Sequence, residues 1–363
     1  MKKYDERNTL FSRVNLEKDS DDYKEYYNDK PLQKEKDDLQ RRLPFRHKLR
    51  KNDRYKELFF PITQHNKIYI KNLFDTSNAY PTNEKRIDVP AKFSSNIKEI
   101  TKYYGATTVG ITELNDSSYY SHQGGLSEFV GINNYGEKVV PKFKTAIVFT
   151  VKMDLEMINK APNFEELLAT EEGYVKVAAI GARLEMYLKS LGYKSQSMNS
   201  ELYLAPLVPL AYDAGLGEIG MCNHIVTKEF GNNIRLGAVF TNLEVDYDKP
   251  VDFGLFEFCK KCALCLMNCP SKAITHKERI VNGRRFYKFD DNKCFDLWLK
   301  AGTDCGTCIS SCPFTQKLDL DKVDKMKENP EIMDEILNDF YQKYGRRPYQ
   351  KGDLDIVKVE EDE

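Results

Sequence analysis

The chain has 363 residues, of which 41% are hydrophobic and 31% are charged, and its formal net charge at pH 7 is −1. This length allows one large domain plus a smaller one, with a sizeable hydrophobic core. The balanced charge gives no indication of nucleic-acid binding, and no run approaches the eighteen or more apolar residues of a membrane span.

Residues 1–92 are densely charged with scattered aromatics, which predicts helical arms and loops that wrap a core or stay partly mobile. Arg41 and Arg42, in "RRLPF", look like a twin-arginine export signal. "RHKLRKNDRYKE" follows where an apolar segment is required, so an exposed basic stretch is the better interpretation. The basic start of the chain also lacks an apolar core behind it, and we therefore expect a cytoplasmic protein.

Helices and strands alternate along the middle of the chain. The run 171–193 is the clearest helix, because Val177, Ile180, Leu184 and Leu188 recur at helical spacing. No βαβ period repeats, which favours an α+β fold over a doubly wound sheet. The other predicted elements are a helix and a buried strand in 96–112, a strand in 144–153, a small-residue helix running into a glycine loop in 205–220, and a strand in 234–245.

The strongest motif begins at Cys259, in "CKKCALCLMNCPSKAI". Its spacing, C-x2-C-x2-C-x3-C-P, is the bacterial ferredoxin run and predicts an iron–sulfur cluster. A second module, "CFDLWLKAGTDCGTCISSCPF", begins at Cys294 and also has proline after its last cysteine. Two such modules in tandem predict two 4Fe-4S clusters, in which the last cysteine of each run ligates the other cluster.

The ligands are therefore assigned as two sets of four cysteines. In the second set Cys294 is the least certain ligand, because ten residues separate it from Cys305 where two are usual. Zinc is a remote alternative, since a structural zinc site uses two separated cysteine pairs. Cys222 belongs to neither set and is expected to be a small core hydrophobe. The first set is Cys259, Cys262, Cys265 and Cys312, and the second is Cys269, Cys294, Cys305 and Cys308.

The segment before the first cysteine run carries a family resemblance. It reads "VPLAYDAGLGEIG", then "IVTKEFGNNIRLGAVFTNLEVDYDKPVDFGLFEF", and continues into the cysteines. The order of AGLGE, TxxFGxxxR, DKP and the FCxxC run resembles the corrinoid-dependent reductive dehalogenases over most of residues 95–318. Epoxyqueuosine reductase, a tRNA-modification enzyme, is a more distant relative with the same plan.

The resemblance implies a nitroreductase-like domain that holds a base-off cobalamin, with a ferredoxin-like domain against it. Electrons would then reach cobalt through two 4Fe-4S clusters, giving Co(I), which cleaves a carbon–halogen bond. The sequence has no D-x-H-x-x-G motif to donate a histidine, in agreement with a base-off corrinoid. The domains are predicted as a charged extension (1–92), the corrinoid-binding domain (93–250), the ferredoxin-like domain (251–318), and a C-terminal helix with an acidic tail (319–363).

The resemblance also implies the residues of the active site. Tyr174 matches the proton donor, Arg235 the cation that stabilises the phenolate, and Asn199 an asparagine that binds halogen or substrate. Tyr174 lies on the same helical face as Val177, so a core tyrosine would give the same pattern. The corrinoid contacts implied by the glycine-rich segments are Gly215, Gly217, Glu218, Thr227 and Gly231.

Three functions remain open from the sequence. The first is a cytoplasmic reductase of the dehalogenase type, which takes electrons from a soluble ferredoxin or flavodoxin and acts on a small organic molecule. The second is a reductase acting on tRNA, which would need a basic groove that the mixed charge does not indicate. The third is a dicluster electron carrier or corrinoid-handling protein without catalysis. A homodimer is compatible with all three, and no membrane partner is expected.

Overall fold

The computed structural model describes residues 3–42, 54–125, 134–200 and 202–358, and of residues 54–57 the backbone alone. The basic stretch 43–53 and the acidic end 360–363 lie outside the described residues. None of the described helices combines the length and apolar character needed to cross a membrane.

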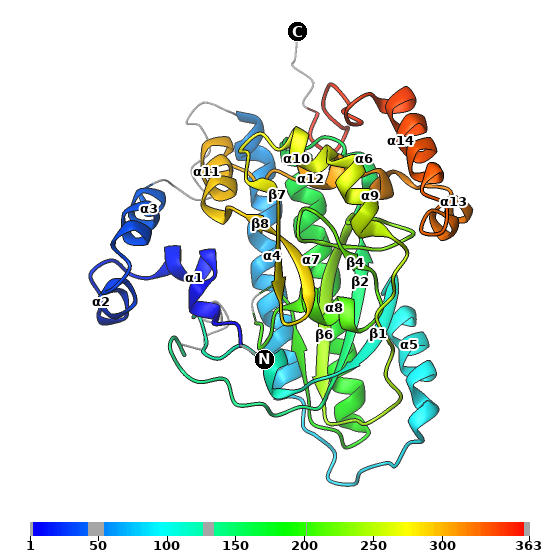
Figure 1. Cartoon of the computed structure of the whole chain (residues 1–363). Coiled ribbons are helices and arrows are strands. Elements are labelled where there is room, and N and C mark those ends of the chain that lie inside the picture. The colour runs from blue at the N-terminus through cyan, green and yellow to red at the C-terminus, as the bar shows by residue number, and fades with distance from the viewer. Residues whose placement is uncertain (1–2, 43–53, 126–133, 201, 359–363) are drawn as a thin grey trace.

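An antiparallel sheet of four strands forms the centre of the molecule, in the order β1-β2-β6-β3 (Figure 1). The middle strand β2 is buried along almost its whole length, as its apolar, β-branched sequence predicts. Every pairing in this sheet is antiparallel, which confirms the α+β prediction. The strands are β1 (Thr108–Glu113), β2 (Thr145–Lys152), β3 (Ser195–Met198) and β6 (Ile234–Thr241).

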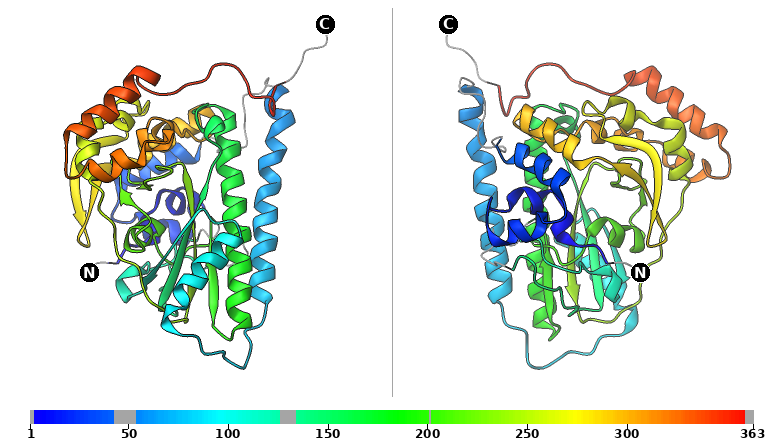
Figure 2. Two further views of the ribbon diagram at one scale, coloured as in Figure 1. Left: turned by 90° about the vertical axis from the view of Figure 1, so that its right-hand side faces the viewer. Right: turned by 60° about the vertical axis from the view of Figure 1, so that its left-hand side comes forward.

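Helix α7 (Phe164–Ser190) packs on one face of this sheet, and α4 (Arg54–Ala79) runs alongside α7 (Figure 2). The α7 side chains predicted to face the core, Val177 among them, are buried against the sheet. The helix begins seven residues before the predicted start, because Phe164 and the residues after it bury against Phe60 of α4. On the opposite face of the sheet lies α8 (Leu207–Asp213).

Residues 3–42 fold into one short 3-10 helix and three short α-helices, here called the N-terminal unit. Their own small core consists of Leu16 and the rings of Tyr23, Tyr26 and Tyr27. The unit lies beside α11 at the edge of the cysteine-bearing region (Figure 1). Its elements are η1 (Glu6–Asn8), α1 (Leu10–Asn15), α2 (Asp21–Tyr27) and α3 (Pro31–Arg41).

The cysteine modules form a separate layer at one end of the sheet (Figure 1). A β-hairpin that the sequence analysis did not anticipate, β7 and β8, connects the two modules. The layer comprises α9 (Leu255–Cys262), α10 (Leu264–Asn268), β7 (Ile274–Val281), β8 (Arg284–Phe289), α11 (Asp291–Ala301), α12 (Thr307–Ser310) and η5 (Pro313–Gln316).

The C-terminal helix packs on this layer. Met333 and Phe340 of α14 join a buried cluster with Phe258 and Phe314, which flank the first set of cysteines. The remaining elements are η2 (Ala91–Phe93), α5 (Ser94–Tyr103), η3 (Asp116–Ser118), α6 (Leu155–Ile158), β4 (Glu218–Ile219), β5 (Ile225–Val226), α13 (Leu320–Lys325) and α14 (Glu331–Tyr344).

Candidate active site and cluster sites

Tyr174 and Arg235 come together where α7 crosses the start of β6. The guanidinium carbon of Arg235 lies 5.2 Å from the centroid of the Tyr174 ring. A methyl group at Gly173 would come within 2.8 Å of Arg235 Cγ, so glycine before the tyrosine lets the arginine pass the helix. A cation at this distance attracts the ring face and stabilises a phenolate by Coulomb attraction.

A short hydrogen-bond chain on α7 holds Arg235. Its Nη2 donates to Thr170 Oγ1 over 2.5 Å, and that hydroxyl donates to Glu166 Oε1 over 3.1 Å. Burial, followed by the nearby Asp304 carboxylate, raises the pKa of Glu166 well above its usual value. Arg235 is thereby connected to the segment that precedes Cys305.

Sequence reasoning missed Glu166 and Thr170, although a signal was present. Glu166, Thr170 and Tyr174 are spaced by four residues and therefore share one face of α7. The predicted helix began at residue 171, which left the first two outside it.

One large cavity, of about 570 Å³, joins this pair to the cysteine layer. This volume lies within the usual range for ligand and cofactor pockets, roughly 300–1,000 Å³. Tyr174 and Arg235 line it together with residues from the N-terminal unit, such as Phe11, and from α11, such as Trp298. Two buried atoms at this site, Arg235 Nε and Glu166 Oε2, make no hydrogen bond within the described part of the chain.

The first set of cysteines surrounds a small cavity of its own. Its four side chains all line that cavity, with Phe258 and Phe314 beside them. The turn between α9 and α10 places Ala263 in a left-handed conformation, with φ at 45°, which brings three cysteines of one short run to the same side. These four lining residues are Cys259, Cys262, Cys265 and Cys312.

The second set lines the large cavity instead. Cys294, the ligand least certain from the sequence, projects from α11 into the same cavity as its three expected partners, Cys269, Cys305 and Cys308. All nine cysteines are free of disulfide bonds. Soft thiolate donors in two groups of four fit two iron–sulfur clusters.

Cys222 was expected to be a small core hydrophobe, and it is buried as expected. It also lies at the boundary between two cavities. It lines both the small and the large cavity, so it lies between the two sets of cysteines. Asn232 Nδ2 donates to its sulfur over 3.4 Å. Its place in the sequence gives no sign of a metal site, because no second cysteine lies near it.

Asn199 directly follows β3, is buried, and exchanges backbone hydrogen bonds with Leu202. It is not among the described side chains that line the large cavity, whereas its neighbours Ser200 and Tyr203 are. Its predicted contact with halogen or substrate stays a prediction.

The five residues predicted to contact the corrinoid make hydrogen bonds or close backbone contacts with other segments of the chain. Glu218 accepts the N–H groups of Phe253 and Leu255, at the start of α9, over 2.7 and 3.2 Å. Gly231, with φ at 58°, lies so close to Thr315 that a methyl group would come within 2.4 Å of its nitrogen. Close backbone contacts of Gly215 with Lys249, of Gly217 with Val226, and of Thr227 with Gly231 complete this set.

Comparison with known proteins finds similar sequences and similar folds. Residues 258–316 match the family model of the 4Fe-4S dicluster domain. Tetrachloroethene reductive dehalogenases match at 31% identity over 258 residues in Sulfurospirillum multivorans and at 27% over 266 residues in Dehalobacter restrictus. The chain resembles the reductive dehalogenases in sequence and in fold. These alignments cover 62% and 61% of this chain, but 51% and 48% of the two relatives.

The fold of a solved catabolic reductive dehalogenase, NpRdhA in complex with 3-bromo-4-hydroxybenzoic acid, superposes with a TM-score of 0.75. It covers 96% of this chain and 47% of NpRdhA at 19% identity. Epoxyqueuosine reductase of Lactococcus garvieae is 29% identical over 132 residues, which is 34% of this chain and 36% of that protein. The chain therefore spans about half the length of the dehalogenases and has the architecture of that family.

Proposed function

We propose that the chain is a cobalamin- and iron–sulfur-dependent reductase of the dehalogenase type, which cleaves a carbon–halogen or similar bond in a small organic substrate. The observation that carries this proposal is the Tyr174–Arg235 pair, which lines the same cavity as Cys269, Cys305 and Cys308. A proton donor and a ligand set for an electron-delivering cluster thus share one space.

The overall reaction assigns a role to each side chain. Replacing a halogen by hydrogen takes two electrons and one proton and releases a halide ion. The Tyr174 hydroxyl supplies that proton as a general acid. Arg235, held by Thr170, faces the ring and lowers the free energy of the phenolate that remains.

The cysteine sets and the lining of the large cavity fit 4Fe-4S clusters and a corrinoid, respectively. The two cysteine sets would hold two 4Fe-4S clusters, which deliver electrons one at a time. The corrinoid would occupy the large cavity beside Arg235 Nε and Glu166 Oε2, two buried atoms that make no hydrogen bond among the described residues, and its cobalt would supply the reducing centre. The roles predicted for Asn199 and for the segment from Gly215 to Gly231 belong to the same proposal.

We further propose a soluble electron donor, a ferredoxin or a flavodoxin, and a cytoplasmic location. Nine free cysteines suit a reducing compartment, in which thiols serve as metal ligands and disulfides are rare. A homodimer is compatible with this proposal, and an oligomer would not change the roles of the residues above.

The test is turnover by the anaerobically reconstituted chain. Reduced methyl viologen replaces the natural donor, and halogenated phenols, halogenated alkenes, small epoxides and a tRNA stem-loop that carries an epoxide are offered in parallel. We expect halide release from at least one halogenated compound. If the enzyme reduces only an epoxide on a tRNA stem-loop and no halogenated compound, the epoxyqueuosine reductase type is favoured. If its clusters are reduced but no substrate is turned over, the chain is an electron carrier.

A further inference from the structure

Cys294 differs from the other seven cluster cysteines because no other cluster cysteine lies close to it in the chain. In the first run, two or three residues separate each cysteine from the next, and a single turn between α9 and α10 sets the geometry of the first three. Ten residues lie between Cys294 and Cys305, and they include most of α11. The local chain therefore leaves the position of Cys294 open, and contacts elsewhere on α11 must set it.

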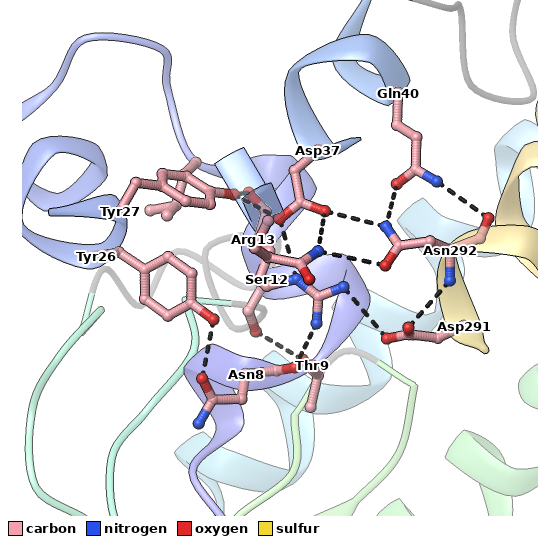
Figure 3. Close-up of polar contacts among 12 residues, drawn as sticks. Asn8, Thr9, Ser12, Arg13, Tyr26, Tyr27, Asp37, Gln40, Asp291 and Asn292 are labelled. Carbon is pink, nitrogen blue, oxygen red and sulfur yellow. Dashed lines mark hydrogen bonds and ion pairs between the residues drawn. The ribbon is translucent and has the colours of Figure 1, made fainter. Parts of the chain in front are cut away.

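The N-terminal unit supplies such contacts through a buried carboxylate. Asp37 has no solvent exposure and accepts four hydrogen bonds, of which one comes from α11 (Figure 3). That one is donated by Asn292 Nδ2 over 3.1 Å, and Arg13 Nε donates over 3.0 Å. Arg13 also reaches Asp291 Oδ2 at 3.2 Å, so the same ion-pair network includes the first residue of α11.

Gln40 holds the same helix at two points. Its Nε2 donates to the backbone oxygen of Asn292 over 3.1 Å and to Asp296 Oδ1 over 2.8 Å. These acceptors stand two residues before and two residues after Cys294 in the sequence. The backbone turn that carries the cysteine is thus fixed on both sides.

Aromatic packing completes the contact. The Phe11 ring meets Phe295 edge to face, with centroids 5.8 Å apart, and lies 6.2 Å from Trp298. Phe295 directly follows Cys294 and is almost fully buried. Polar and apolar contacts from one unit therefore converge on the few residues around this cysteine.

We propose that the N-terminal unit is a positioning element for the second cluster, which holds α11 so that Cys294 reaches the cluster bound by Cys269, Cys305 and Cys308. The inference rests on the proposed function, because it assumes that Cys294 is a ligand. It assigns the unit a part in cluster assembly, separate from any contact of the unit with substrate.

The experiment compares three variants with the native chain after anaerobic reconstitution. Phe11→Ala/Gln40→Ala removes contacts with α11 and leaves every residue of α11 native. Tyr26→Phe is the matched control, because the Tyr26 hydroxyl bonds to Asn8 inside the unit and not to α11. Cys294→Ala removes the proposed ligand itself.

Each protein is titrated with ferricyanide and examined by electron paramagnetic resonance and iron analysis. A 4Fe-4S cluster in the 2+ state that lacks a firm fourth ligand loses Fe²⁺ and passes one electron to ferricyanide, and a 3Fe-4S cluster in the 1+ state remains. The native chain and Tyr26→Phe should keep about eight irons, and Cys294→Ala about seven. Phe11→Ala/Gln40→Ala should show the 3Fe-4S signal in at least half of its chains.

The cluster of the first set serves as an internal control in every sample, since its cysteines lie in a separate cavity. Loss of both clusters together, or a lost circular dichroism spectrum, would mean general unfolding and would contradict a specific positioning role. If Phe11→Ala/Gln40→Ala gives the native signal while Cys294→Ala gives a 3Fe-4S signal, the positioning role of the N-terminal unit is wrong, and the assignment of Cys294 as a ligand stands. A native signal in Cys294→Ala would instead overturn the ligand assignment within the proposed function.

Discussion

The two walls of the large cavity are built in different ways. One wall comes from α7 and β6, where Tyr174 and Arg235 project from regular elements of the central sheet domain. The other comes from α11 and the N-terminal unit, which meet through contacts such as Asp37 with Asn292, 255 residues apart in the sequence. The first wall is fixed by packing within one domain, whereas the second depends on long-range docking. Variants of the first wall should therefore change chemistry, and variants of the second should change stability and cluster integrity.

The largest effect is expected at the first wall. Tyr174→Phe keeps the ring beside Arg235 but removes the proton donor, and general-acid catalysis contributes about 10²-fold or more. We expect turnover of the reconstituted enzyme to fall by about that factor, with native iron and corrinoid contents. Tyr187→Phe, farther along the same helix, is the control and should leave turnover unchanged. Undiminished turnover by Tyr174→Phe would refute the proton-donor role.

The second effect tests how the N-terminal unit is anchored. Burial, more than the neighbouring Asp5, raises the pKa of Glu6 to about 7 from an ordinary value of 4.5, against the opposing hydrogen bond from the Gly124 N–H. As the pH rises, Glu6 therefore ionises in the unfolded chain before it ionises in the folded chain. The free energy of unfolding is highest below about pH 4.5 and falls until the pH passes 7. The loss at pH 8 is on the order of 3 kcal/mol.

Glu6→Gln should remove this loss, since glutamine keeps an acceptor for the Gly124 N–H and carries no charge. We expect the variant to exceed the native chain in free energy of unfolding at pH 8 and to match it near pH 4, measured by urea titration. Glu17→Gln, at an exposed position of the same unit, is the control. An equal difference at both pH values would contradict the burial of an ionisable Glu6.

The smallest effect concerns the placement of Arg235. Thr170→Val keeps the shape of the side chain but removes the acceptor for Arg235 Nη2. A hydrogen bond to a charged group is worth roughly 1.5 kcal/mol, so the rate of turnover should fall about tenfold while KM changes little. Thr101→Val removes a hydroxyl that donates to the Ile97 carbonyl within α5, away from the cavity, and should have no effect on turnover. An equal loss in both variants would indicate a general effect on packing.

The same difference between the walls explains what the sequence could predict. Helical spacing along α7 correctly identified Val177 and its neighbours as core, and the family motifs placed Tyr174 and Arg235, which the fold brings together. Cysteine spacing predicted two sets, and each lines one cavity. These features depend on residues close in sequence or on a recognised motif.

The rest depends on contacts between distant segments, for which periodicity carries no signal. Nothing in the spacing of Asp37 indicates that it binds Asn292, or that Phe11 packs on Phe295. Cys222 gave no pattern because its neighbours in space come from both cysteine modules. The β7–β8 hairpin between the two cysteine modules likewise has no motif in the sequence that predicts it.

The most direct test of the central claim is the cofactor content of the anaerobically reconstituted chain. If the large cavity holds a corrinoid between Tyr174 and the second set of cysteines, each chain should bind about one corrinoid and about eight irons. A chain that takes up the iron in full but no corrinoid would contradict the claim.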